Sequence, residues 1–79
     1  MQNYAFVPKV IHARVGQSIH WVNEDNVGHN VTGTGGPKFT ASSTFSQGGS
    51  YTLKLSQPGT YTYICTIHPF MKGTIVVTP

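Results

Sequence analysis

The stretch Cys65-Thr66-Ile67-His68-Pro69-Phe70-Met71 decides how this sequence is interpreted. It places a thiol, an imidazole and a thioether within seven residues, on a loop just before the last predicted strand. A second imidazole, that of His29, lies far back in the sequence at the start of another predicted strand. A thiolate with two imidazoles and a weak axial thioether is the donor set of electron-transfer copper, whereas one Cys with one Met is a poor set for structural zinc. The sequence therefore predicts a mononuclear copper site between strands.

Outward from this loop, short stretches of alternating apolar and polar residues are separated by turn residues. Strands are predicted over residues 9–15, 18–23, 29–32, 44–46 (weakly), 50–55, 60–64 and 72–78, with a loop over 33–43. The turn Gln57-Pro58-Gly59 predicts that strand 60–64 pairs back onto strand 50–55. Six or seven short strands with frequent turn signals are typical of an antiparallel sandwich or small barrel. No repeat, linker or second unit is visible, so residues 1–79 are predicted to form one domain.

Composition limits the function classes. The chain has 79 residues, one cysteine and 9% charged residues, with a formal net charge of +3. A chain this short gains little from its core and has no internal disulfide, so a bound metal would add to its folding free energy. The basic residues form no run, and no apolar stretch approaches the ~20 residues of a membrane span. We expect no membrane insertion, and we expect Met1 to stand ahead of a mature domain whose signal peptide is absent from the sequence.

Several residues outside the loop have ordinary interpretations. Phe6 and Trp21 are expected in the core, because Ile19, Trp21 and Asn23 alternate onto one face of their strand. His12 and His20 alternate out of their strands and are expected at the surface rather than in a second metal site.

Five motifs carry a resemblance to a known family: Ala5-Phe6-Val7-Pro8, Val15-Gly16, Trp21-Val22-Asn23, His29-Asn30-Val31 and Gly59-Thr60-Tyr61, followed by the short Cys-x₂-His-x₂-Met loop. From about Tyr4 to its end the chain resembles the cupredoxins, the first part plastocyanin and the last part amicyanin. The resemblance implies an all-β, antiparallel Greek-key sandwich of about six to eight short strands.

The same resemblance implies the roles of the site residues. His29, Cys65 and His68 would be the equatorial copper ligands and Met71 the axial one, with one copper per chain. Asn30 would support the loop through hydrogen bonds near Cys65 and Thr66, and such outer partners tune a metal site.

The sequence also departs from the family pattern. Gly28 stands where plastocyanin and amicyanin have Pro, and its carbonyl is expected to approach the metal opposite Met71, as the matching glycine does in azurin. Ile64 replaces the Tyr of plastocyanin. The acidic docking patch of plant plastocyanins has no counterpart, because Glu24 and Asp25 are the only acids. An N-terminal edge strand is expected to be missing or shortened.

The surface for electron exchange is predicted around the edge of His68. The side chains of Ile67, Pro69 and Phe70, with Val27 and Tyr4 nearby, would form an apolar patch of low charge there. His29 is expected to be enclosed. A small surface of this kind suits brief contacts with redox partners.

The leading hypothesis is an electron shuttle between transient redox protein donors and acceptors: a monomer without substrate turnover, in the periplasm or otherwise outside the cytoplasm. A dinuclear copper subunit is excluded, because it needs two cysteines. A multicopper oxidase or nitrite reductase needs further histidine clusters, although a domain cut from a longer redox protein stays open. A basic all-β nucleic-acid binder is disfavoured, because the aromatic residues form no stacking motif among Lys and Arg, so no nucleic acid is expected as a partner.

Overall fold

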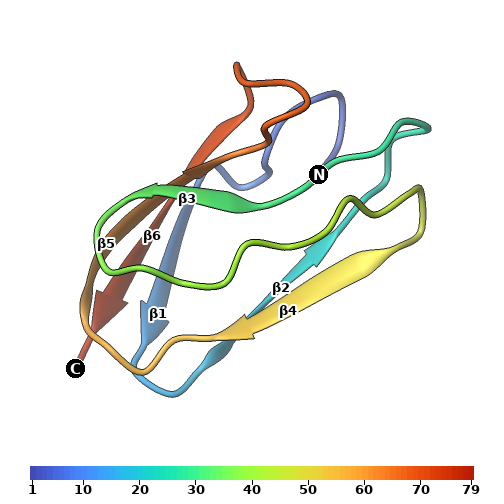
Figure 1. The fold of residues 1–79 in the computed structure, drawn as a ribbon. Helices are drawn as coiled ribbons and strands as arrows, with labels where there is room; N and C mark the ends of the chain where they lie inside the picture. Colours follow the sequence, from blue (N-terminus) through green and yellow to red (C-terminus); the bar gives the residue numbers. More distant parts are fainter.

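The computed structural model describes residues 1–79 and is built of strands alone (Figure 1). The six strands are β1 (Val10–Arg14), β2 (Ser18–Val22), β3 (Thr32–Gly35), β4 (Ser50–Lys54), β5 (Gly59–Ile64) and β6 (Lys72–Thr78). None of its elements is a helix of the length and apolarity needed to cross a membrane. The predicted all-β class is therefore confirmed.

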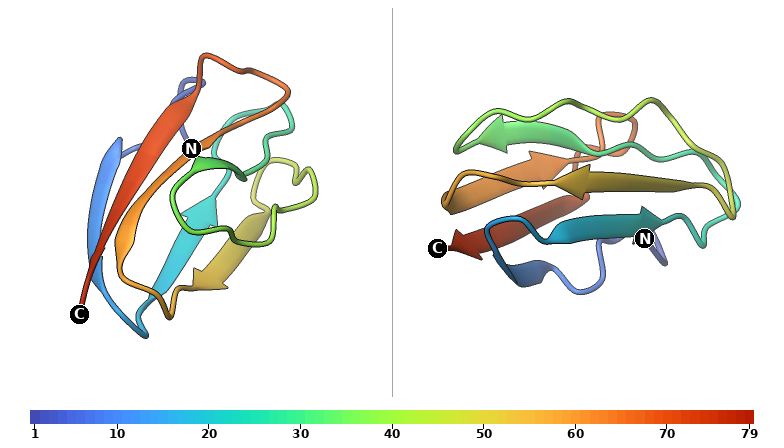
Figure 2. Two further views of the ribbon diagram at one scale, coloured as in Figure 1. Left: turned by 60° about the vertical axis from the view of Figure 1, so that its left-hand side comes forward. Right: turned by 90° about the horizontal axis from the view of Figure 1, so that it is seen from below.

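The strands form two facing layers (Figure 2). One is a four-stranded sheet in the order β1-β6-β5-β3, and the other is the pair β2-β4. Apolar residues at every second position turn inward, because successive side chains of a strand point to opposite faces. Ile19 and Trp21 of β2 are buried in the same core cluster as Tyr61 and Tyr63 of β5, as the alternation predicts.

The core between the layers is dominated by aromatic rings. Tyr63 lies edge-on to Phe6, with ring centroids 4.8 Å apart, and to Trp21 at 5.5 Å. Burying an aromatic or large aliphatic side chain stabilises a fold by about 1.5–3 kcal/mol. The remaining buried apolar residues are Met1, Val31, Leu55, Cys65, Met71, Ile75 and Val77. Two potential metal donors, Cys65 and Met71, thus belong to the core itself.

The predicted pairing of 60–64 onto 50–55 is wrong. β4 pairs with β2, whereas β5 pairs with β3 and β6 in the other sheet. The segment after β4 leaves the β2-β4 sheet at Leu55. The Leu55 carbonyl accepts a hydrogen bond from the Gly16 N–H at 2.9 Å, and not from a residue of β5. Pro58, which has no N–H to donate, then precedes β5.

Three further expectations need correction. β1 and β6 pair in parallel, so the sandwich is not purely antiparallel. Residues 29–31 precede their strand, which begins at Thr32 and runs into the predicted loop. The weak strand at 44–46 is reduced to a single bridge between Phe45 and His29. Short Gly- and Thr-rich segments carry little alternation, which explains why their bounds were misplaced.

Candidate metal centre

The loop from Cys65 to Met71 connects β5 to β6 at one end of the sandwich. Its own backbone closes it: the Cys65 N–H donates to the Met71 carbonyl at 3.1 Å, and the Met71 N–H donates to the His68 carbonyl at 2.9 Å. Because both ends of the loop continue into paired strands, the side chains of Cys65, His68 and Met71 start from fixed backbone positions.

His29 reaches the same end of the sandwich from the segment that precedes β3. Its N–H donates to the Phe45 carbonyl at 3.2 Å, and the Phe45 N–H donates to the His29 carbonyl at 3.0 Å. This bridge holds the His29 backbone without a strand, and the side chain is fully buried.

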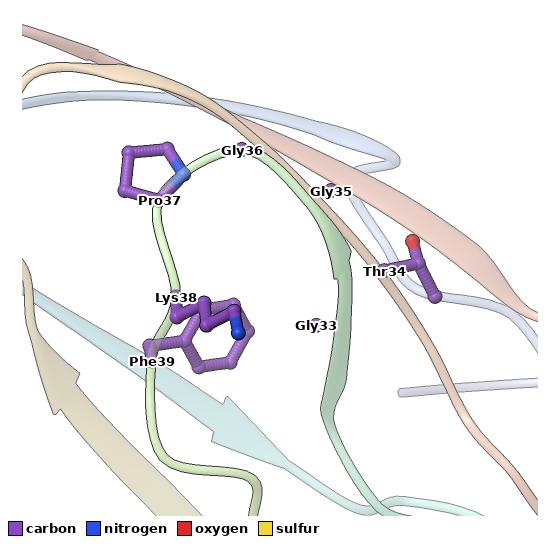
Figure 3. A pocket seen from close by; sticks show the side chains of 7 residues that line it. All are labelled: Gly33, Thr34, Gly35, Gly36, Pro37, Lys38 and Phe39. Atoms are coloured by element: carbon purple, nitrogen blue, oxygen red, sulfur yellow. The ribbon is translucent and has the colours of Figure 1, made fainter.

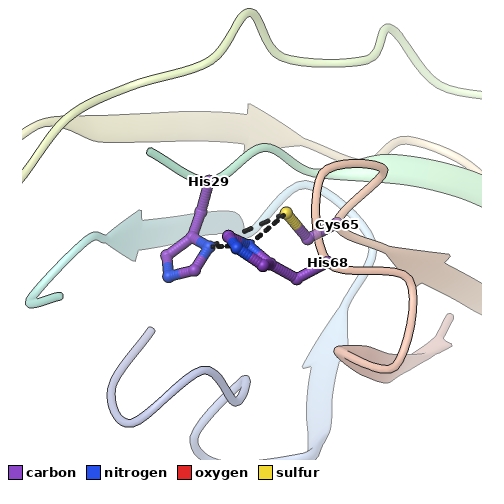
Figure 4. Close-up of side chains that lie close together, drawn as sticks. All are labelled: His29, Cys65 and His68. Atoms are coloured by element: carbon purple, nitrogen blue, oxygen red, sulfur yellow. Dashed lines mark hydrogen bonds between the residues drawn. The ribbon is translucent and has the colours of Figure 1, made fainter. Parts of the chain in front are cut away.

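Three donor atoms converge between these segments (Figure 4). Cys65 Sγ lies 3.7 Å from Nδ1 of His29 and 4.0 Å from Nδ1 of His68, and the two Nδ1 atoms are 3.2 Å apart. A triangle of this size has a point roughly 2 Å from each corner, close to the bond lengths of a transition metal to imidazole nitrogen and thiolate sulfur. The donor set therefore fits one metal ion in size, and its soft sulfur with two imidazoles fits copper in chemistry.

Met71 and Gly28 are the two other positions at which the resemblance predicts contacts with the metal. Met71 is 1% exposed and belongs to the core. Gly28 is half-buried, and a Cβ built there would lie 2.7 Å from Cγ2 of Thr44. A larger residue at position 28 would therefore require Thr44 to move.

Asn30 connects the two segments that supply the donors. Its Nδ2 donates to Oγ1 of Thr66 at 2.7 Å, and its Oδ1 accepts the Thr66 N–H at 3.0 Å. Its backbone N–H donates to Cys65 Sγ at 3.5 Å. Thr32 adds a hydroxyl bond to the same Oδ1 at 3.1 Å. Asn30 thus links the Cys65 loop to the His29 segment. The partial positive charge of its backbone N–H lies next to the Cys65 sulfur.

Asp25 was singled out only as an acid, yet it contacts the site directly. Its Oδ2 lies 2.8 Å from Nε2 of His29. Burial alone would raise the pKa of Asp25, but hydrogen bonds from Tyr4, His29 and Asn3 lower it below its ordinary value. Since an ionised carboxylate only accepts hydrogen bonds, Nε2 is the donor and Nδ1 keeps its lone pair toward the triangle. The spacing of an acid four residues before His29 was the signal available in the sequence.

The loop that carries Asp25 is organised by a buried amide. Asn23 Nδ2 donates to the carbonyls of Val27 and Phe45 at 2.8 and 2.9 Å, and its Oδ1 accepts the Asp25 N–H at 2.9 Å. Asn23 was expected only to share an inward strand face. Its amide instead fixes the path of residues 23–27 toward His29.

The His68 side of the triangle is more exposed than the His29 side. His68 is half-buried, and it follows Ile67, which is 47% exposed, and precedes Phe70, which is 68% exposed. Pro69 is exposed as well, and Val27 is half-buried. Of the residues predicted around His68, Tyr4 and Phe70 lie close to it, with ring centroids 5.0 and 6.0 Å away. His12 and His20 are exposed on β1 and β2, away from this set.

A hollow of about 280 Å³ is lined by residues 33–39, on β3 and the turn that follows it (Figure 3). Lys38 is its one charged side chain and Phe39 its one aromatic ring. It shares no residue with the donor triangle, which is the one cluster of three or more His, Cys, Asp or Glu donors in residues 1–79. The hollow therefore offers no cluster of metal ligands, and the donor triangle is the candidate site.

The chain is similar to known copper proteins in sequence. The family model of copper-binding proteins of the plastocyanin/azurin family matches residues 1–78. Amicyanin-alpha of Methylorubrum extorquens is 39% identical over 70 residues, which cover 85% of this chain and 59% of that protein. Amicyanin of Paracoccus denitrificans is 36% identical over 70 residues, which cover 85% of this chain and 53% of that protein. This chain thus spans little more than half the length of these curated relatives.

Solved structures show the same likeness. An oxidized amicyanin variant matches with a TM-score of 0.91 at 29% identity, covering 98% of this chain and 76% of that one. A copper-containing nitrite reductase from Thermus scotoductus matches with a TM-score of 0.87 at 34% identity, covering 95% of this chain but 20% of the enzyme chain. The predicted resemblance is confirmed, and the chain belongs to the copper-binding plastocyanin/azurin family, the cupredoxins.

Proposed function

We propose that residues 1–79 form a single domain that carries one electron at a time on one copper ion, with His29, Cys65 and His68 as equatorial ligands and Met71 as the axial ligand. The observation that carries the proposal is the triangle of donor atoms, with edges of 3.2, 3.7 and 4.0 Å. Copper bound there would supply the one-electron change between Cu(II) and Cu(I).

The protein's part is to keep the donors in place through that change. His29 is held by Asp25 and by the Phe45 bridge, and the Cys65 loop is held by Asn30. Donors that are fixed in this way need little rearrangement between the two oxidation states, which favours fast transfer. The absence of substrate turnover belongs to this proposal.

The partners would be redox proteins met briefly outside the cytoplasm at the exposed side of His68. Apolar contact around Phe70 suits a small and short-lived interface. Lys9 and Lys72 line a hollow of about 260 Å³ together with Tyr4 and Phe70. A partner with acidic groups near its own redox centre would therefore be attracted.

The visible spectrum after addition of Cu(II), combined with metal analysis, tests the function. We expect one copper per chain and an intense absorption from the bond between copper(II) and the Cys65 sulfur. The Cys65→Ala variant should lose this absorption. Two coppers per chain, or colour in Cys65→Ala, would contradict the ligand assignment.

The axial role of Met71 has its own test. Met71→Gln should keep copper bound, because the axial ligand is weak. The stronger oxygen donor should lower the reduction potential and redistribute the visible bands. Loss of copper from Met71→Gln, or an unchanged potential and spectrum, would show that the proposed role is wrong.

A second candidate is the copper domain of a longer redox enzyme, favoured by the match to part of a nitrite reductase chain. Such an enzyme needs a catalytic metal centre in addition to an electron-transfer centre. Residues 1–79 supply one donor cluster. A carrier loaded with one copper should exchange electrons with redox proteins without reducing nitrite, whereas steady nitrite reduction would favour the enzyme.

A further inference from the structure

The carboxylate of Asp25 lies between a proposed copper ligand and the N-terminal segment. Its Oδ2 accepts the Nε2–H of His29 at 2.8 Å and the backbone N–H of Tyr4 at 2.9 Å. Its Oδ1 accepts the N–H of Asn3 at 2.7 Å. The Asp25 side chain is only 10% exposed. One charged group thus fixes an imidazole and two amides from a segment more than twenty residues away.

The N-terminal segment is held in a demanding conformation. Gln2 and Ala5 exchange two backbone hydrogen bonds, at 3.0 and 3.1 Å, and the two residues between them have positive φ. The φ angles are 54° at Asn3 and 57° at Tyr4. Asn tolerates this region, whereas a bulky residue adopts it only at a cost in free energy. Hydrogen bonds to a charged group are stronger than those between neutral groups, so the two bonds to the Asp25 carboxylate can hold the turn.

The turn places the Tyr4 ring on the metal site. Its centroid lies 5.7 Å from that of His29 and 5.0 Å from that of His68, in both cases edge-on. The same ring stacks on Phe70 at 6.5 Å. Tyr4 therefore contacts the buried imidazole, the open imidazole and the exposed apolar patch at once. Residues in strained backbone conformations persist where their surroundings hold them, and they concentrate at functional sites.

We propose that Asp25 is a positioning residue of the copper site, which fixes His29 and, through the amides of Asn3 and Tyr4, seats the Tyr4 ring against both imidazoles. The inference rests on the proposed function. The hydrogen bond at Nε2 sets the tautomer and the plane of the His29 ring, as carboxylates do for metal-bound histidines in general. The negative charge beside the ring favours the oxidised, more positive site and so lowers the reduction potential.

The chain offers a matched control for this charge. Glu24 is the only other acid, it precedes Asp25 directly, and it is exposed with no hydrogen bond to its carboxylate. Asp25→Asn and Glu24→Gln remove the same charge one residue apart. Only Asp25→Asn changes the group that faces His29 and the two amides.

The test uses the copper-loaded protein, reduced for NMR and cycled for the potential. In the unmodified protein, the His29 Nε2–H and the amides of Asn3 and Tyr4 should be protected from solvent exchange. In Asp25→Asn, exchange of these protons should become about tenfold faster or more, since 1.4 kcal/mol corresponds to a factor of ten. Contacts of the Tyr4 ring with both imidazoles should weaken, and the potential should rise. Glu24→Gln should leave all of these unchanged.

Three outcomes would overturn the proposal. One is the same change in proton exchange and reduction potential in Asp25→Asn and Glu24→Gln, which would show that only the net charge matters. Another is exchange of the Asn3 and Tyr4 amides in the unmodified protein at the rate of the exposed Gln47 amide, a measurement that does not depend on a variant folding. The third is a His29 Nε2–H signal that is unaffected by Asp25→Asn. Failure of the proposed function would instead appear as the lack of copper-thiolate absorption in the unmodified protein.

Discussion

The two imidazoles of the metal centre are held in opposite ways. His29 is fully buried, its backbone is bridged to Phe45, and its Nε2 is bound by a carboxylate. His68 lies on a loop, is half-buried, and has no acidic partner among residues 1–79. The difference separates two tasks that one site must combine. In the proposed carrier, the anchored side would keep the donor geometry fixed, and the more exposed side would let a partner approach within contact distance of a ligand.

The largest expected effect is the loss of a ligand on each side. His29→Gly and His68→Gly should each weaken copper binding more than about a hundredfold, since even outer partners of a metal site are worth about 10–100-fold. Added imidazole should restore the visible absorption of His68→Gly at far lower concentration, because that vacated position opens to solvent. Titration of both variants with imidazole, followed by absorption, checks this. Equal rescue on the two sides would break the comparison.

Removal of copper should lower the melting temperature of the whole domain. A ligand that binds only the folded state at a thousandfold excess over its Kd stabilises by about 4 kcal/mol. In a domain of this size each kcal/mol moves Tm by about 4–8 °C, so the copper-loaded protein should melt more than about 15 °C above the metal-free protein.

Hydrogen exchange of the metal-free protein should show that the two sides of the metal centre respond unequally to the loss of copper. The amides of residues 65–71 should lose more protection than those of residues 25–30, which keep the Asp25 and Phe45 bonds. Equal melting temperatures would show that the fold does not depend on its metal. Equal loss of protection would show that the two sides are not anchored differently.

A charge on the open side should slow electron self-exchange. Phe70→Lys places like charges face to face when two molecules meet, and a penalty of about 1.4 kcal/mol slows the reaction about tenfold. Val15→Lys makes the same charge change on an apolar residue that is 39% exposed just past the end of β1, where its N–H bonds Thr78. Self-exchange measured by NMR line broadening should fall in the first variant alone. A rate that is unchanged in Phe70→Lys would remove this surface from consideration.

The smallest expected effect is on the anchored side, where protonation of Asp25 at low pH should lower the free energy of unfolding. Because folding lowers the pKa of Asp25, its contribution to the free energy of unfolding is present above the ordinary carboxyl pKa of about 3.9. It is lost as the pH falls below that value and through the folded pKa. Denaturant unfolding between pH 7 and pH 3 should therefore show a shallower pH dependence for Asp25→Asn than for Glu24→Gln. Identical slopes would show that Asp25 is not engaged in the folded state.

The donor set could be predicted because its chemistry is local. Cys65, His68 and Met71 fall within one loop, and their combination of donor types is rare outside copper sites. Inward strand faces were predictable for the same kind of reason, since Ile19 and Trp21 alternate within five residues of β2. A pattern of this kind specifies a face whatever strand lies beside it.

The pairing of strands and the contacts between distant segments were not predictable in the same way. Alternation in β5 says which side of the strand is buried, but not that its partners are β3 and β6 rather than β4. The contact of Asp25 with His29 has a local signal in their spacing, but its contacts with Asn3 and Tyr4 have none, because they require the N-terminal turn to fold back on residue 25. Contacts between segments far apart in sequence leave no periodic trace in either segment.

The parallel pairing of β1 with β6 determines how the molecule responds to tension. Five residue pairs join the two strands, from Val10 with Thr74 to Arg14 with Thr78. Met1 lies toward the metal end and Pro79 at the other (Figure 1). Pulling the two ends apart therefore loads this pairing in shear, with all its bonds sharing the force. The hydrogen bonds of Met1 to Val22 and Glu24, and then the turn at Asn3 and Tyr4, lie between the N-terminus and this pairing. We therefore expect the N-terminal segment, which carries Tyr4 against both imidazoles, to take the load before β1 and β6 do.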